Sequence, residues 1–320
     1  MANNNKLLGL MSLLFFISCD DILEENISND LVTPITPTSE SVITNNVINF
    51  SWNASDGVDD YRLQLLDNNQ SNLIILDSLV STTSFQHPLD PGNYKWRVRG
   101  ENFAYETAYS FPISFSVIAS SDLTNQSVIL NTPTANLYTN STNILCTWNE
   151  LPFADSYSFE LIKNLNGQTT EVQQTGITAT SYSVNTSVFD VDAEYIWKVK
   201  AVNATTETTF TSRSLFLDRE APNQPSLVSP ADDEIITTID IDFNWTLGQD
   251  NGNVQSEIES ILEISQDANF NSIIETITVN NGNSQQVSIE NVGTYYWRVR
   301  AKDAAQNVSS NSISRSFITQ

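Results

Sequence analysis

The chain has 320 residues, enough for two or three domains with sizeable hydrophobic cores. Its 38 acidic and 14 basic residues give a net charge of −24, which argues against nucleic-acid binding because that function needs a basic surface. At 40% hydrophobic and 10% aromatic residues, the chain is too apolar for a disordered acidic protein, and one His with two Cys leaves little material for zinc sites or His-based catalysis.

Residues 1–18 have the pattern of a signal peptide, because the apolar run 7–17 is short for a membrane-spanning helix. Ser18 is a small residue directly before Cys19. The pattern resembles the lipobox of bacterial lipoproteins, in which a peptidase cuts before a Cys that is then lipidated. Phe16 departs from it, since the lipobox usually has Leu there. An ordinary secretory signal with an incidental Cys is the alternative.

An acidic tether is predicted over residues 19–31, which carry Asp20, Asp21, Glu24 and Glu25. Like charges repel and keep such a segment extended and solvated. The acidic run resembles the export signal of surface lipoproteins in some Gram-negative bacteria. The resemblance implies attachment to the outer membrane through lipid on Cys19, with the protein facing outward; a generic acidic linker is the alternative.

Three internal repeats follow from the six tryptophans, which form the pairs Trp52/Trp96, Trp148/Trp197 and Trp245/Trp297. The first members are 96 and 97 residues apart, and the second members are 101 and 100 apart. A proline precedes each first tryptophan by 15 residues. Such registration indicates three homologous units of about 95 residues.

Each unit has the same strand signals, and no helical period interrupts them. Apolar and polar residues alternate over 48–52 and 241–245, and more loosely over 144–148, which predicts strands with one buried face. A late strand reads YKWRVRG from Tyr94, YIWKVKA from Tyr195 and YYWRVRA from Tyr295. About seven short strands per unit predict a two-sheet antiparallel sandwich.

The early-strand tryptophan and the Y-x-W-[RK]-V-[RK]-[GA] strand resemble fibronectin type III domains. The approach Leu89-Asp90-Pro91-Gly92-Asn93-Tyr94 is similar to their tyrosine corner, whereas the second unit replaces Pro-Gly with Val191-Asp192-Ala193-Glu194 before Tyr195. The resemblance implies an all-β chain of three tandem immunoglobulin-like sandwiches. We place them at 32–119, 126–218 and 224–320.

The residues that could carry chemistry are mostly expected in structural roles. Cys146 aligns with Phe50 and Phe243, so we expect a buried free thiol. His87 lies in a turn without a nucleophile suggested by any motif. Period-2 alignment with the late-strand valines places the tryptophans in the cores rather than on a carbohydrate platform.

Seven of the 14 basic residues lie on the late strands, and we expect them to pair with the neighbouring strand in charge ladders such as Glu160 with Lys198 or Lys200. A basic stripe for an acidic glycan is the alternative. The aromatic residues expected at exposed loops are Phe103, Tyr105 and Phe153, which makes them the candidates for ligand binding.

The third unit has gained six residues between its second and third strands, since Trp52 to Tyr61 spans nine residues and Trp245 to Ser260 spans fifteen. We expect this loop at the distal end of the protein and assign any ligand or calcium effect to residues 246–259; a neutral insertion is the alternative. Hard cations bind several oxygens, although the spacing is not that of an EF-hand. The candidate calcium ligands are Asp250, Asn251, Asn253, Glu257 and Glu259. No other cofactor is predicted.

The sequence therefore predicts a non-catalytic surface lipoprotein whose three sandwiches act as a spacer or binding arm, with a surface protein or polysaccharide as partner. A glycan-binding accessory lipoprotein of a polysaccharide uptake system is the alternative, favoured by exposed aromatics at one loop end. A glycoside hydrolase would need a cleft with two carboxylates about 5–10 Å apart, and no motif singles out such a pair.

Overall fold

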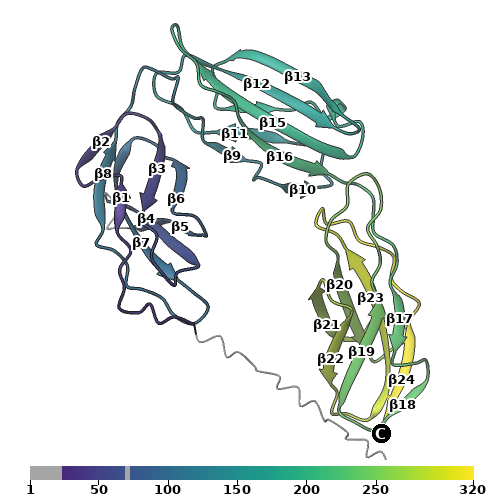
Figure 1. Ribbon diagram of the computed structural model, residues 1–320. Helices are drawn as coiled ribbons and strands as arrows, with labels where there is room; N and C mark the ends of the chain where they lie inside the picture. Colours follow the sequence, from purple (N-terminus) through teal and green to yellow (C-terminus); the bar gives the residue numbers. More distant parts are fainter. Residues whose placement is uncertain (1–23, 69–72) are drawn as a thin grey trace, which may run out of the picture. The chain divides into compact units, whose positions relative to one another are not determined.

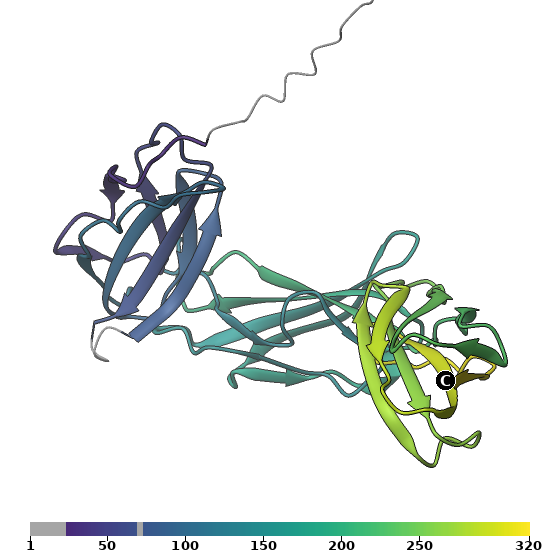
Figure 2. The same ribbon diagram turned by 90° about the horizontal axis from the view of Figure 1, so that it is seen from below.

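The computed structural model describes residues 24–68 and 73–320, and these residues form strands with no α-helix (Figures 1 and 2). The signal peptide and Cys19 lie outside the described residues. The tether predicted over residues 19–31 is not solvated throughout, because Ile27 within it is fully buried. By contact density the described chain divides into two compact units. Unit 1 comprises residues 24–42, 49–68, 73–87 and 92–116, and unit 2 comprises 43–48, 88–91 and 117–320.

The strands fall into three sets of eight, which we call repeats 1, 2 and 3. The strands of repeat 1 are β1 (Pro34–Thr36), β2 (Ser41–Ile43), β3 (Val47–Trp52), β4 (Asp60–Asp67), β5 (Leu73–Val80), β6 (Ser84–Pro88), β7 (Gly92–Glu101) and β8 (Ile113–Val117). Those of repeat 2 are β9 (Leu130–Thr132), β10 (Leu137–Thr139), β11 (Leu145–Trp148), β12 (Ser156–Asn164), β13 (Gln168–Ile177), β14 (Ser181–Ser183), β15 (Ala193–Val202) and β16 (Thr211–Leu217), with a short 3₁₀ turn η1 (Thr186–Val188). Those of repeat 3 are β17 (Ser226–Ser229), β18 (Glu234–Ile236), β19 (Asp240–Thr246), β20 (Glu259–Ser265), β21 (Ile273–Asn280), β22 (Ser284–Ser288), β23 (Gly293–Lys302) and β24 (Arg315–Thr319).

Each repeat has one three-stranded and one five-stranded sheet, in the same order. The five-stranded sheets run β2-β8-β7-β4-β5, β10-β16-β15-β12-β13 and β18-β24-β23-β20-β21. The three-stranded sheets, each written from its first strand in the chain, run β1-β3-β6, β9-β11-β14 and β17-β19-β22. This confirms the predicted all-β chain of three immunoglobulin-like, fibronectin type III-like sandwiches.

Eight strands per repeat replace the predicted seven because the first strand changes sheets. In repeat 3, β17 belongs to the three-stranded sheet and β18 to the five-stranded sheet, where it pairs in parallel with β24. Pro230 lies between β17 and β18, in the place that Pro37 and Pro133 have in the other repeats. Proline has no N–H to donate, so it interrupts the ladder where the chain crosses over.

The tryptophans lie in the cores, as their alternation with polar neighbours predicts. All six have relative exposures of 2% or less. In repeat 1, Phe50 packs edge-on against Trp96, with ring centroids 5.3 Å apart, and Phe243 packs in the same way against Trp297 at 5.1 Å. Aromatic pairs in this geometry stabilise a core beyond the area that they bury.

The tyrosine corner is present in repeat 2 in spite of its altered turn. The hydroxyl of Tyr195 donates a 2.9 Å hydrogen bond to the carbonyl of Val191, and that of Tyr295 donates one of 3.0 Å to Asn291. Because the acceptor is a backbone carbonyl, the bond does not need the Pro-Gly sequence that the first unit has.

Candidate functional site

The predicted aromatic candidates lie at exposed loops. Phe103 is 94% exposed, Tyr105 is 38% exposed and Phe153 is 58% exposed. The backbone N–H of Tyr105 donates to Oδ1 of Asn102 at 2.8 Å, so Asn102 fixes the loop that presents Phe103 and Tyr105. Sequence reasoning did not single out Phe111, which is 87% exposed just before β8.

Cys146 has the buried environment that its sequence position predicts, whereas His87 lies within β6 and not in the predicted turn. The thiol of Cys146 is fully buried, and burial raises its pKa to about 12, so it stays protonated. Partial burial lowers the pKa of His87, which stacks against Phe85 with ring centroids 6.1 Å apart.

The basic residues of the late strands form the predicted charge ladders. Lys198 pairs with Glu160 at 2.7 Å, while Lys200 pairs with Glu207 at 2.8 Å rather than with Glu160. In repeat 3, Glu263 accepts from Arg298 at 2.7 Å and is itself only 5% exposed. These contacts favour the ladder over the basic stripe, because Lys198, Lys200 and Arg298 already face carboxylates.

The five calcium candidates of the inserted loop do not come together. Glu259, on β20, pairs with Lys302 at 2.7 Å. Asn251 donates from Nδ2 to the carbonyl of Ala221 at 3.1 Å, and the side chains of Asn253 and Glu257 are exposed. Asp250 alone joins a group of carboxylates, with two residues that sequence reasoning did not name.

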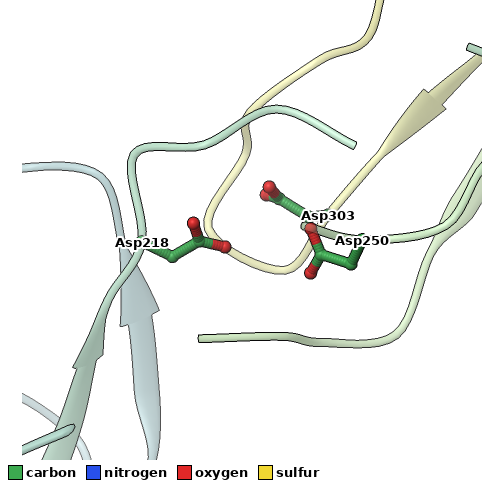
Figure 3. A group of neighbouring side chains, drawn as sticks. All are labelled: Asp218, Asp250 and Asp303. Carbon is green, nitrogen blue, oxygen red and sulfur yellow. The ribbon is translucent and has the colours of Figure 1, made fainter. Parts of the chain in front are cut away.

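That group consists of Asp218, Asp250 and Asp303, all in unit 2 (Figure 3). One carboxylate oxygen from each lies within 4.8 Å of the others. Asp218 directly follows β16, Asp250 lies in the loop between β19 and β20, and Asp303 directly follows β23. Asp218 and Asp303 are each 1% exposed, so the group is largely shielded from solvent.

The hydrogen bonds around the group leave one oxygen unused. Asp250 Oδ2 accepts from the backbone N–H of Ser256 at 2.7 Å, and Asp303 Oδ1 accepts from that of Asn307 at 2.8 Å. Asp218 Oδ1 accepts from the N–H of Glu220 at 3.0 Å. Asp218 Oδ2 is buried and accepts no hydrogen bond from the described residues, and its carboxylate points toward the other two (Figure 3).

Asp218 has an unusual pKa for a carboxyl group. Burial, which disfavours the charged form, raises the pKa to about 6, and the negative charges of Asp250 and Asp303 act in the same direction. Within residues 24–68 and 73–320, no lysine or arginine forms an ion pair with any of the three aspartates.

The inserted loop does not lie at the distal end of repeat 3, and that prediction is wrong. Ser226, the first residue of β17, pairs with Thr246, the last residue of β19. Since these strands are antiparallel, the loop after β19 lies beside the segment that enters the repeat.

Backbone contacts hold the entering segment against this loop. The N–H of Asn223 donates to the carbonyl of Gln249 at 2.8 Å. A Cβ on Gly248 would lie 1.8 Å from the carbonyl oxygen of Asn223, so only glycine permits this approach.

Among the described residues, no helix has both the length and the apolar character needed to cross a membrane.

No family model and no curated protein matches the chain. Solved structures do match it. The FN1–FN3 domains of chicken CNTN1 share 14% identity, cover 90% of this chain and 97% of that chain, and give a TM-score of 0.42. A selenomethionine-substituted chicken interferon gamma receptor alpha chain shares 13% identity, covers 58% of this chain and 96% of that chain, and gives a TM-score of 0.25.

Proposed function

We propose that the chain is a non-catalytic lipoprotein of the bacterial outer membrane, with its three sandwiches serving as a spacer or binding arm for a surface protein or polysaccharide. One observation supports the non-catalytic role: the tryptophans and most of the late-strand basic residues that recur in the repeats are buried or paired. The recurring tryptophans fill the cores, and recurring basic residues such as Lys198 and Arg298 pair with carboxylates on the neighbouring strand. The loop after β19 is six residues longer than its counterparts, and loops are where recognition residues are usually found. The lipid anchor rests on the sequence around Cys19.

The burial of the aspartate group argues against the hydrolase alternative. A hydrolytic pair must reach both the glycosidic oxygen and the anomeric carbon of a substrate. Asp218 and Asp303 are each 1% exposed and cannot contact a sugar without opening the fold.

The glycan-binding alternative is favoured by the loop of residues 102–106. It presents Phe103, the most exposed of the large hydrophobic side chains of the described residues, beside Tyr105. Aromatic side chains at a fixed loop are typical of recognition surfaces.

The lipid anchor is tested by replacing the predicted acceptor. In cells that process lipoproteins, Cys19→Ala should remain unlipidated and move from the detergent phase to the aqueous phase on partitioning. Cys146→Ala is the control, because it removes the other cysteine and should leave partitioning unchanged. Unchanged detergent partitioning of Cys19→Ala would refute the lipoprotein assignment.

Glycan recognition is tested with the full chain on an array of polysaccharides. Any glycan that the parent binds should no longer bind to Phe103→Ala and should still bind to Phe111→Ala, since Phe111 is 87% exposed but lies outside the loop 102–106. If no polysaccharide is retained, or if both variants bind as well as the parent, the glycan-binding alternative fails and the spacer function stands.

A further inference from the structure

The residue six positions after the second tryptophan of repeat 2 joins separate segments of the chain by hydrogen bonds. There it is Asn203, whose Oδ1 accepts from the backbone N–H of Thr206 at 2.8 Å. Its Nδ2 donates to two carbonyls: that of Ser121, in the segment entering the repeat, at 2.9 Å, and that of Phe153, in the loop after β11, at 3.2 Å. One amide thus joins three pieces of chain.

Repeat 1 uses the same arrangement. Asn102 accepts from the N–H of Tyr105 at 2.8 Å and donates from Nδ2 to the carbonyls of Glu25 and Gly57, both at 2.8 Å. Glu25 precedes the first strand, and Gly57 lies in the loop after β3. The entering segment and the loop are therefore held by amide donors in both repeats.

Repeat 3 has Asp303 at this position, and an ionised carboxylate has no hydrogen to donate. Asp303 still accepts a backbone hydrogen bond as the two asparagines do, because its Oδ1 accepts from the N–H of Asn307 at 2.8 Å. On the donating side, the entering segment supplies Asp218 and the loop supplies Asp250. Where repeats 1 and 2 set a donor against two carbonyls, repeat 3 sets three carboxylates against one another.

The nearby lysine and arginine side chains do not neutralise these three carboxylates. Arg219 pairs through Nε with Asp192 at 2.5 Å, and Lys302 pairs with Glu259 at 2.7 Å. Asn307 donates from Nδ2 to the carbonyl of Asp218 at 3.0 Å, which replaces part of the lost amide contact but adds no charge. Asp218 Oδ2 stays buried without a hydrogen-bond donor from any described residue.

We propose that Asp218, Asp250 and Asp303 bind one calcium ion, which takes the place of the amide donor of repeats 1 and 2. The ion ties the segment that enters repeat 3 to the loops after β19 and β23. This assignment does not depend on the lipid anchor or on glycan binding.

The donor set selects the metal. Oxygens that lie within 4.8 Å of one another suit calcium, whose oxygen ligands stand about 2.3–2.6 Å from the ion in flexible geometry. Magnesium demands a nearly ideal octahedron at about 2.0–2.1 Å and keeps several waters. Zinc favours nitrogen and sulfur ligands, and this group offers neither.

The test is calcium titration of the full chain in detergent, followed by calorimetry, after removal of metal with a chelator. One ion per chain should bind, with a dissociation constant on the order of 10⁻⁴–10⁻³ M, as in extracellular modules. Calcium should also raise the thermal midpoint of repeat 3. No binding at about 10 mM, or tighter binding of magnesium than of calcium, would overturn the assignment.

Three variants locate the ion. Asp303→Asn restores the residue type that repeats 1 and 2 carry, so it should fold, and it should weaken calcium binding by more than about ten-fold. Asp250→Asn, at a less buried position, should weaken it likewise and serves if Asp303→Asn folds poorly. Glu257→Gln is the matched control, since it removes one charge from the same loop outside the group and should bind as the parent does. Equal binding by Asp303→Asn and the parent would refute the site.

Discussion

Repeats 2 and 3 hold the loop after the first tryptophan strand in different ways. In repeat 2, the hydroxyl of Tyr157 accepts a 2.8 Å hydrogen bond from the backbone N–H of Leu151 and so fixes the short loop after β11. Repeat 3 has Ser260 at that position. Its hydroxyl accepts instead from Nε1 of Trp245 at 2.8 Å, and a side chain of that length does not reach the loop.

The longer loop of repeat 3 is held by a carboxylate. Asp250 accepts from the N–H groups of Asn251 at 2.9 Å and Ser256 at 2.7 Å. A phenol holds a loop without charge, whereas a carboxylate brings a negative charge to a place where Asp218 and Asp303 already lie. The comparison teaches that the same fold can hold this loop either with a neutral hydroxyl or with a charged carboxylate. Only the carboxylate can also bind a cation.

The largest effect is expected where the two repeats are alike. Trp148→Ala and Trp245→Ala should each destabilise their own repeat by about 3–5 kcal/mol, because both side chains are at most 2% exposed. Scanning calorimetry of the full chain should show one transition lowered in each variant. A variant that melts like the parent would show that its tryptophan is not a core residue and that the repeats differ in their cores as well as in their loops.

A smaller effect should separate the two loops. Tyr157→Phe leaves the buried N–H of Leu151 without its acceptor, at a cost of about 1–3 kcal/mol. Amide hydrogen exchange should quicken at residues 149–155 and stay unchanged at residues 247–258. Ser260→Ala is the counterpart, because it deprives Trp245 of its acceptor without touching the loop of repeat 3. Unchanged exchange at residues 149–155 in Tyr157→Phe would mean that the phenol does not hold the loop.

The smallest effect concerns repeat 1, where the protein supplies its own cations. Hydrogen bonds from Arg62, then from Arg99, hold the pKa of Glu101 below its usual value. A lowered folded-state pKa contributes stability that is present above the unfolded pKa of about 4.3 and is lost as the pH falls through the folded value. The thermal midpoint of repeat 1 should therefore fall when the pH is lowered below about 4. In Glu101→Gln the midpoint should fall less with pH, and parallel plots of midpoint against pH for variant and parent would contradict this prediction.

The cores and the ladders were predictable from sequence because their signals are local. Alternation around Trp52 and Trp297 fixes which side of a strand is buried, and the sheet then sets Glu160 opposite Lys198. These depend on period-2 geometry and on the order of neighbouring strands, which a repeated sequence reveals.

The aspartate group was not predictable in the same way. Asp218, Asp250 and Asp303 are far apart in the chain and meet only because antiparallel strands bring the entering segment and two loops to one end of repeat 3. A signal did exist: Asn102, Asn203 and Asp303 occupy equivalent positions, and the change from amide to acid marks the site. That signal acquires meaning only when the two carbonyl partners of the amides are known.

The position of Asp218 has a consequence for dissecting the protein into modules. The predicted domain limits, 126–218 and 224–320, assign Asp218 to one piece, and Asp250 and Asp303 to the next. A fragment that begins at residue 224 carries two of the three carboxylates, however well it folds. The separated modules should therefore not bind the proposed ion. In the intact chain, calcium affinity would depend on residues 219–223, which join Asp218 to repeat 3. A protease cut in that segment would release calcium without unfolding either module.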